Sequence, residues 1–309
     1  MPIMYKKMIC TALMLAALAP AWAAEWMTDL EAAKAKAAAE NKAVLVDFTG
    51  SDWCGWCVRL RKEVLDKPEF EAYAKDKFVL MEVDLPQNPK FDAALRARNE
   101  KIAEQYGVSG FPTIMVLSPA GDIAGGFNGY LSSVGAVTKE LNEALAAVEL
   151  LKKAETQPDA QKLESLVKVY RGLPDKMQQG AASLRQRIIA LDPQDTTGIG
   201  RLQKIEEQRA AFQQALGRVH TKADALAVVD KTLASAYPEN KSGIYQAKFQ
   251  ILMMGAESPE DVKAAVEAGR AAMELDPEIS AADRKRFEDS FADPAAVFKR
   301  IQQLRSQKK

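Results

Sequence analysis

The sequence Trp53-Cys54-Gly55-Trp56-Cys57 places two cysteines three residues apart, where a helix is expected to begin. At this spacing in the first turn of a helix, both side chains lie on one face and can form a disulfide. The helix N-terminus directs unpaired backbone N–H groups and the positive end of its dipole at the first sulfur, which favours the thiolate. We therefore expect Cys54 to be the attacking nucleophile and Cys57 to resolve the mixed disulfide.

Two other chemistries can use a pair of closely spaced cysteines. A zinc site takes about four ligands, and the chain has one further cysteine, Cys10, and a single distant histidine, His220. Two thiolates also suit copper(I), but no methionine or histidine lies beside the motif. Both alternatives stay open. We expect no metal, and no cofactor beyond the redox-active disulfide Cys54–Cys57.

The first 23 residues have the pattern of a signal peptide. Lys6 and Lys7 precede an apolar stretch at residues 8–18, and the small residues Ala21 and Ala23 form an A-x-A cleavage pattern. The apolar stretch is too short for a membrane span, which needs roughly 20 residues. We therefore expect cleavage after Ala23, an exported protein in the periplasm or another extracytoplasmic compartment, and no membrane span in the mature chain.

The pattern on both sides of the cysteine motif predicts an α/β domain over residues 24–148. Residues 43–48 form a nearly continuous apolar run, typical of a strand buried on both faces. Further strands are expected at residues 78–84, 113–117 and 122–127, the last two joined by the turn sequence Ser118-Pro119-Ala120-Gly121. Helices are expected at residues 28–41, from about Trp53, at residues 91–106, and from Ser132 or Ser133 to about Ala147.

Residues 149–309 have a different pattern, with successive amphipathic helices and no strand candidate. For example, Ser258-Pro259 is a helix start with proline at the first helical position. Two helices end alike, in Leu191-Asp192-Pro193 and Leu275-Asp276-Pro277, which suggests stacked helical hairpins of tetratricopeptide type. No regular period of about 34 residues accompanies them. We expect an all-α domain here, with the boundary near Val148.

Three segments in order resemble the thioredoxin family, in its exported bacterial branch, over residues 25–148. They are the strand at residues 44–48, the motif at residues 52–57, and Gly110-Phe111-Pro112-Thr113. The resemblance implies a thioredoxin-like fold with a central mixed sheet flanked by helices. It also implies a cis Phe111–Pro112 bond with exposed backbone beside the cysteines, where a substrate peptide can pair. Substrate contacts are then expected at Trp53, Trp56, Phe111, Pro112 and Thr113.

The resemblance makes Asp47 the buried acid that accepts the proton of Cys57. One extra residue separates Asp47 from the motif, and Leu80 stands where thioredoxin has a lysine beside this acid. A buried strand carboxylate bonded to its neighbours is the alternative for Asp47. Next to the motif, Trp53 is expected to pack beside the cysteines and Trp56 to lie exposed. The following Arg59, Arg61 and Lys62 are expected on the solvated face of the helix.

Charge and length limit the possible functions. The chain has 42 basic and 42 acidic residues, so no net charge attracts nucleic acid or an anionic membrane. Its 309 residues accommodate two domains. We expect a thiol–disulfide oxidoreductase, a reductase or isomerase, that acts on cysteine-containing client proteins and is served by an upstream thiol donor or acceptor. The helical domain would bind the client or partner. The alternative is a helical interaction scaffold with the thioredoxin-like domain as a platform.

Overall fold

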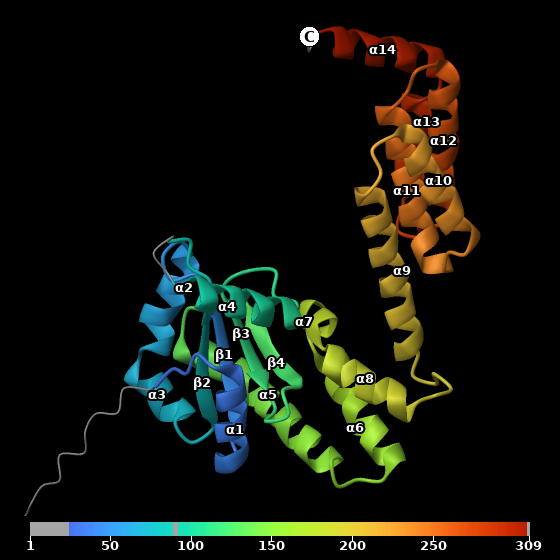
Figure 1. Cartoon of the computed structure of the whole chain (residues 1–309). Helices are drawn as coiled ribbons and strands as arrows, with labels where there is room; N and C mark the ends of the chain where they lie inside the picture. Colours follow the sequence, from blue (N-terminus) through green and yellow to red (C-terminus); the bar gives the residue numbers. More distant parts are fainter. Residues whose placement is uncertain (1–24, 89–91, 308–309) are drawn as a thin grey trace, which may run out of the picture. The chain divides into compact units, whose positions relative to one another are not determined.

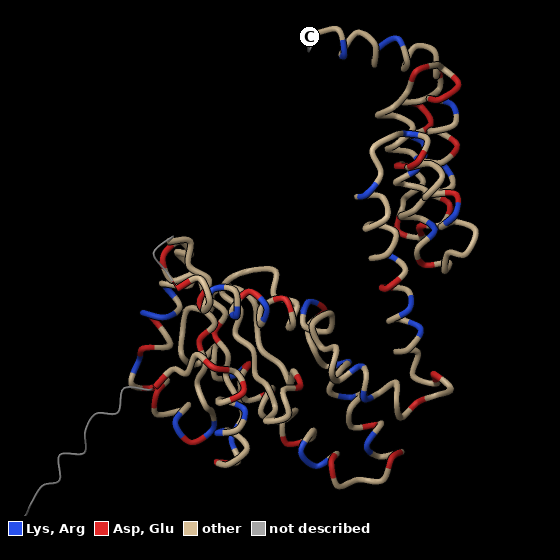
Figure 2. Tube along the Cα trace, viewed as in Figure 1, with Lys and Arg blue, Asp and Glu red and all other residues tan. Residues whose placement is uncertain are grey.

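A computed structural model of the chain describes residues 25–88 and 92–307, which form two compact units. The first unit ends at Pro193 and the second begins at Gln194 (Figure 1). The expected signal peptide, residues 1–23, lies outside the described residues. Basic and acidic residues are interspersed along both units, as Figure 2 shows, in line with the zero formal net charge.

The first unit is built on a four-stranded mixed sheet in the order β2-β1-β3-β4. Strand β1 (Ala43–Thr49) pairs in parallel with β2 (Phe78–Asp84) and antiparallel with β3 (Thr113–Leu117). Strand β3 pairs antiparallel with β4 (Ile123–Asn128). All residues of β1 are buried, as expected for a central strand covered on both faces. The mixed sheet predicted from the sequence is confirmed.

Helices cover both faces of the sheet (Figure 1). One layer contains α1 (Leu30–Glu40) and α4 (Ala93–Gln105); the other contains the π-helical turn η1 (Arg61–Leu65), α3 (Pro68–Ala74) and α5 (Val134–Ala154). Successive residues of a strand point to opposite faces. Asp47 of β1 therefore contacts Arg61 of η1, whereas the next residue, Phe48, packs against Tyr106 at the end of α4.

Short polar side chains set the starts of the long helices. Asp29 caps α1 by accepting a hydrogen bond from the backbone N–H of Ala32 at 2.9 Å. Ser133 caps α5 in the same way through Ala136 at 3.2 Å. The sequence predicted a first helix over residues 28–41. The structure places its cap at Asp29 and its first residue at Leu30, because the Asp29 carboxylate is a good cap acceptor.

Three further helices belong to the first unit, so the compact unit ends at Pro193 and not at the predicted boundary near Val148. They are α6 (Asp159–Gly172), α7 (Asp175–Gly180) and α8 (Ala182–Leu191). Helix α5 continues through Val148 without a break and packs against α6. Buried Asp122, just before β4, accepts a hydrogen bond from Ser183 Oγ at 2.8 Å and forms an ion pair with Arg187. These polar contacts tie α8 to the sheet.

The described residues of the second unit form helices joined by turns and short loops, and no strand. This unit contains α9 (Ile199–Gly217), α10 (Lys222–Ala234), α11 (Pro238–Met254), α12 (Pro259–Glu274), α13 (Ala281–Ser290) and α14 (Pro294–Ser306). One core cluster centres on Phe212, Val229 and Ile244, and a second on Ala256, Val262 and Val266. Helix α12 begins at Pro259 with Ser258 as its cap, as predicted.

The expectation that the chain is helical beyond the α/β domain is confirmed for the described residues, whereas the tetratricopeptide assignment stays a prediction. None of the described helices combines the length and the apolar character that a membrane span requires.

Candidate redox-active site

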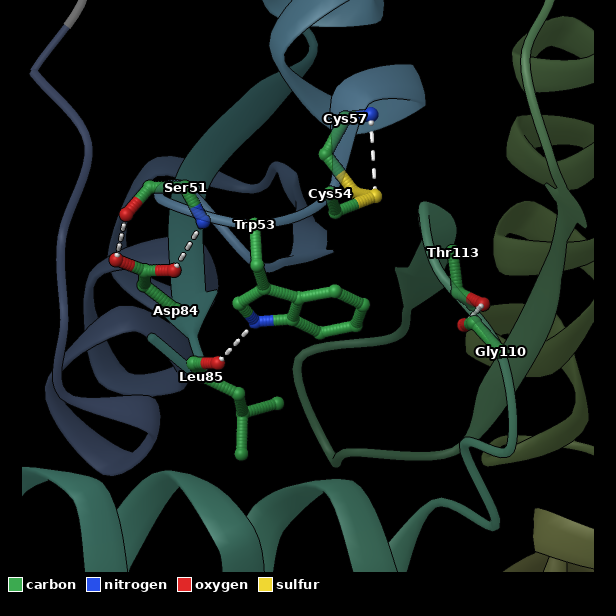
Figure 3. Close-up of a disulfide and its surroundings, with 8 residues drawn as sticks. All are labelled: Ser51, Trp53, Cys54, Cys57, Asp84, Leu85, Gly110 and Thr113. Carbon is green, nitrogen blue, oxygen red and sulfur yellow. Dashed lines mark hydrogen bonds between the residues drawn. A yellow bond between two sulfur atoms is a disulfide. The ribbon is translucent and has the colours of Figure 1, made fainter. Parts of the chain in front are cut away.

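Cys54 and Cys57 are joined in a disulfide at the start of α2 (Gly55–Leu60), with their Cα atoms 5.2 Å apart. Cys54 is the N-cap residue, and its Sγ accepts a hydrogen bond from the backbone N–H of Cys57 at 3.2 Å (Figure 3). The exposed fraction is 6% for Cys54 and 3% for Cys57. In the reduced protein, this N–H and the helix dipole would stabilise a thiolate on Cys54.

The loop before the cysteines is anchored to the end of β2. Ser51 donates through its backbone N–H and its Oγ to the Asp84 carboxylate, at 2.9 and 2.6 Å. The indole N–H of Trp53 donates to the carbonyl of Leu85 at 2.8 Å (Figure 3). A Cβ at Gly50 would lie 2.4 Å from the Trp53 indole, so this close approach requires glycine. The anchored loop thus fixes the position of the residue before Cys54.

The Phe111–Pro112 peptide bond is cis, as the resemblance implied. The rings of Trp53 and Phe111 meet edge to face, with centroids 5.5 Å apart, which brings this loop beside the cysteine motif. The carbonyl of Pro112 accepts a hydrogen bond from the backbone of Gly129 at 2.8 Å. Within the described residues, the backbone N–H and C=O of Phe111 make no hydrogen bond to another backbone group.

Thr113 is buried, and its side chain supports the loop internally. Its Oγ1 donates to the carbonyl of Gly110 at 2.8 Å and accepts from Asn128 Nδ2 at 2.6 Å (Figure 3 shows the first of these). The resemblance implies a substrate contact at Thr113. In the structure, its side chain holds the cis-proline loop and does not face solvent.

Trp56 lies on the surface beside the disulfide, with an exposed fraction of 58%, against 43% for Trp53. Its ring packs on Tyr130, with centroids 5.4 Å apart, and the Arg59 guanidinium lies over both rings, at 5.7 and 4.9 Å from their centroids. Glu63 accepts hydrogen bonds from Arg59 and from the Tyr130 hydroxyl. Sequence reasoning expected the exposure of Trp56 but missed Tyr130, which follows β4 and carries no local signal.

Asp47 lies in the middle of β1 with an exposed fraction of 3%. Its burial raises the pKa of the carboxyl group from 3.8 to about 6, although the nearby Arg61 guanidinium acts in the opposite direction. Arg61 Nη2 is 3.5 Å from Asp47 Oδ2. A carboxyl group with this pKa can exchange protons near neutral pH.

Arg61 corrects one expectation from the sequence. It was expected on the solvated face, but its guanidinium reaches Asp47, forms an ion pair with Glu82 and lies 4.2 Å from the centroid of the Trp26 ring. The replacement of the thioredoxin lysine by Leu80 stays a prediction. In the sheet register the residue opposite Asp47 is Glu82, and the cation beside Asp47 comes from Arg61 in the helical layer. A cation four residues after Cys57 was the available sequence signal.

Among the described residues, no group of three or more His, Cys, Asp or Glu side chains is placed to hold a metal ion. The arrangement brings together the two sulfur atoms of the disulfide, the buried Asp47 carboxyl group nearby and the exposed aromatic surface of Trp56.

The sequence model of a family described as thioredoxin-like matches residues 25–119, the part of the chain that holds the sheet, the disulfide and the cis-proline loop. The chain therefore carries a thioredoxin-like domain, which confirms the resemblance. It is 34% identical over 82 residues to the disulfide bond reductase DsbH of Chlamydia pneumoniae, across 26% of this chain and 49% of that protein. It is 35% identical over 94 residues to the thioredoxin-related protein DsbJ of the same organism, across 30% of this chain and 27% of that protein.

The aligned part thus spans about half the length of one curated relative and about a quarter of the other. Among solved structures, a DsbH oxidoreductase is 27% identical over 40% of this chain and 84% of its own, with a TM-score of 0.36. The oxidised C-terminal domain of Neisseria meningitidis DsbD is 21% identical over 38% of this chain and 99% of its own, with a TM-score of 0.30.

Proposed function

We propose that this protein is an exported thiol–disulfide oxidoreductase, a reductase or isomerase, that exchanges the Cys54–Cys57 disulfide with cysteines of client proteins. The observation that carries the proposal is the disulfide at the start of α2, with Cys54 as the N-cap and Cys57 donating to its sulfur. The name of the relative DsbH, a disulfide bond reductase, supports the reducing direction.

The reducing reaction begins with the Cys54 thiolate attacking one sulfur of a client disulfide. This forms a mixed disulfide and releases the first client thiolate. Cys57 then loses its proton, and its thiolate attacks Cys54 Sγ, which restores the Cys54–Cys57 disulfide and releases the second client thiolate. Two electrons pass from the protein dithiol to the client disulfide, and the released thiolates take protons from solvent. An upstream thiol donor must reduce the disulfide again.

Asp47 is proposed as the acceptor of the Cys57 proton. A group that accepts a proton during turnover works best with a pKa near the working pH, and burial moves the pKa of Asp47 in that direction. No cofactor beyond the two cysteines is proposed, because the two-electron exchange needs only the sulfur atoms of the protein and the client.

The client is proposed to contact the surface around the disulfide. Trp53 and Trp56 offer exposed aromatic area, and half-buried Phe111 has backbone groups without a backbone partner. Pro112 is buried, so it would contribute through the cis bond that shapes this loop. Thr113 would contribute by holding this loop in shape. The helical residues 149–309 are proposed to select or hold the client or a partner. The signal-peptide pattern in residues 1–23 supports the proposed export.

Reduction of insulin disulfides by the pure, reduced protein tests this function. We expect two titratable thiols per chain, active reduction of insulin, and loss of activity in Cys54→Ser. A protein with intact thiols that does not reduce insulin or isomerise a scrambled disulfide protein would contradict the proposal. That result would favour the alternative of a helical interaction scaffold with a thioredoxin-like platform.

A further inference from the structure

The guanidinium of Arg61 is held on three sides. It lies 4.2 Å from the centroid of the Trp26 ring, forms an ion pair with Glu82, and approaches Asp47 with Nη2 3.5 Å from Oδ2. Its side chain is 23% exposed, and that of Asp47 is 4% exposed. We propose that Arg61 is a positioning residue for disulfide exchange: it keeps Asp47 as a carboxylate that can accept the proton of Cys57. This inference rests on the proposed function and assigns a role within it.

The backbone connects Arg61 directly to the turn that carries Cys57. Arg61 follows Cys57 by four residues, and its backbone N–H bonds to the Cys57 carbonyl. Residues four apart on a helix lie on the same face. The helical turn that places Cys57 therefore also sends a cation onto the buried carboxyl group of β1. Trp26 and Glu82 also contact this cation, so its position does not depend on Asp47 alone.

The charges around Asp47 explain why it needs a fixed cation. Glu82 is its register partner on β2, and paired residues of adjacent strands point to the same face. Asp84 on β2 and Asp66 after η1 each raise the pKa of Asp47 further, as does burial. Within the described residues, Arg61 is the cation in ion-pair range of this carboxyl group. Without Arg61, burial and the surrounding carboxylates all favour the protonated acid, which cannot accept a proton.

The test is a titration of the Asp47 carboxyl carbon by NMR in the reduced full chain, for Arg61→Gln and the control Lys62→Gln. Both variants lose one positive charge from neighbouring positions of η1, but Lys62 is exposed and does not reach Asp47. We expect Arg61→Gln to raise the midpoint of the Asp47 titration by about 1 pH unit or more. Lys62→Gln should leave it within error of the unchanged protein. An unshifted midpoint in Arg61→Gln would overturn the proposal.

A second variant keeps the test decisive if Arg61→Gln does not fold. Glu82→Gln removes a neighbouring carboxylate, so that Asp47 is the one carboxylate left to pair with Arg61. The midpoint of the Asp47 titration should therefore fall. A midpoint that stays constant or rises in Glu82→Gln would overturn the proposal.

The pH profile of mixed-disulfide resolution then shows whether Arg61 acts through Asp47. Arg61→Gln should move this profile to higher pH, and it should have no further effect in an Asp47→Asn background. A shift that persists in the double variant would mean that Arg61 acts by another route. Failure of the proposed function would appear differently, as an unchanged protein that does not reduce insulin.

Discussion

The backbone N–H of Cys57 donates a hydrogen bond to Sγ of Cys54 at 3.2 Å, within the first turn of α2. A donor aimed at one sulfur favours the thiolate on that sulfur, so the two cysteines are not equivalent. We predict that Cys57→Ser traps mixed disulfides with clients through Cys54, whereas Cys54→Ser traps almost none. Non-reducing electrophoresis and mass spectrometry would measure this. Equal trapping by the two variants would reverse or remove the assignment of roles.

We predict a reduction potential of roughly −250 to −200 mV for the pair. The starting point is the value of about −270 mV for thioredoxin, whose motif has a proline where this chain has Trp56. Trp56 restores a backbone N–H that proline lacks, and one more hydrogen bond to a thiolate contributes at most about 1.5–3 kcal/mol. At about 30 mV for each 1.4 kcal/mol, this makes the pair more oxidising by no more than roughly 30–65 mV.

The charge of Asp52 opposes this change. The backbone N–H groups of Gln87 and Asn88 bond to its carboxylate and lower its pKa, so a negative charge stays near the cysteines. Equilibration with glutathione measures the potential. A value near −120 mV, which is about that of a dedicated oxidase, would contradict the proposed direction of electron flow.

We predict that Tyr130→Ala weakens the action on protein clients more than the chemistry itself. Tyr130 packs on Trp56 and donates to Glu63, so its loss frees the exposed indole from its support. An aromatic pair contributes about 0.5–1.5 kcal/mol, equivalent to a rise of KM for a protein disulfide of roughly 2- to 10-fold. The rate with a small disulfide such as oxidised glutathione is the internal control and should change little. An equal loss with both substrates would show that Tyr130 supports the cysteines rather than the client surface.

We predict that Asp47→Asn stabilises the folded protein at neutral pH, in both the reduced and the oxidised state. The folded-state pKa of Asp47 is raised from 3.8 to about 6, so between these values the folded state binds more protons than the unfolded state. The free energy of unfolding therefore falls as pH rises through this window, by up to about 3 kcal/mol from this group. In thermal unfolding, the melting temperature of Asp47→Asn should be higher than that of the unchanged protein at pH 7. The difference in melting temperature should become smaller towards pH 4. A constant difference across this range would contradict the raised pKa.

We predict that a shortened chain ending at Pro193 folds cooperatively and reduces a small disulfide, whereas one ending at Ala147 is strongly destabilised. The domain boundary that the sequence predicted near Val148 would make Ala147 a tolerated end. A cut there divides α5 and removes Arg187 and Ser183, the partners of buried Asp122. Circular dichroism melts of the two shortened chains provide the measurement. If the chain ending at Ala147 melts at the same temperature as the longer one, α6–α8 do not contribute to the stability of the first unit.

Gly180→Val tests a second contact between α6–α8 and the rest of the first unit, the packing of α7 against the end of α4, in the whole chain. A Cβ at this position would lie 2.0 Å from the backbone carbonyl oxygen of Tyr106, so α7 must move away from the end of α4. We expect a lower melting temperature. Gly172→Val is the matched control, because a Cβ there meets nothing within 4 Å. Equal losses in the two variants would point to helix propensity instead of this contact.

The sequence by itself determined the features that depend on local spacing and hydrophobic pattern. The spacing of Cys54 and Cys57 at a helix start predicted their disulfide, and the buried run at residues 43–48 predicted a central strand. Ser258-Pro259 predicted a helix start in the same way. Each of these features depends on residues close together in the sequence, where the backbone geometry of a helix or strand allows few arrangements of the side chains.

Only the tertiary structure decided which distant residues complete the site and where the first unit ends. Tyr130 meets Trp56, and Arg61 meets Asp47, because the sheet register and the packing of η1 bring them together. In the same way, the ion pair between Asp122 and Arg187 connects α8 to the sheet, and the first compact unit ends at Pro193. The sequence around one residue of such a pair does not indicate which distant residue it will contact, because the contact forms only when the sheet and the helical layers pack together.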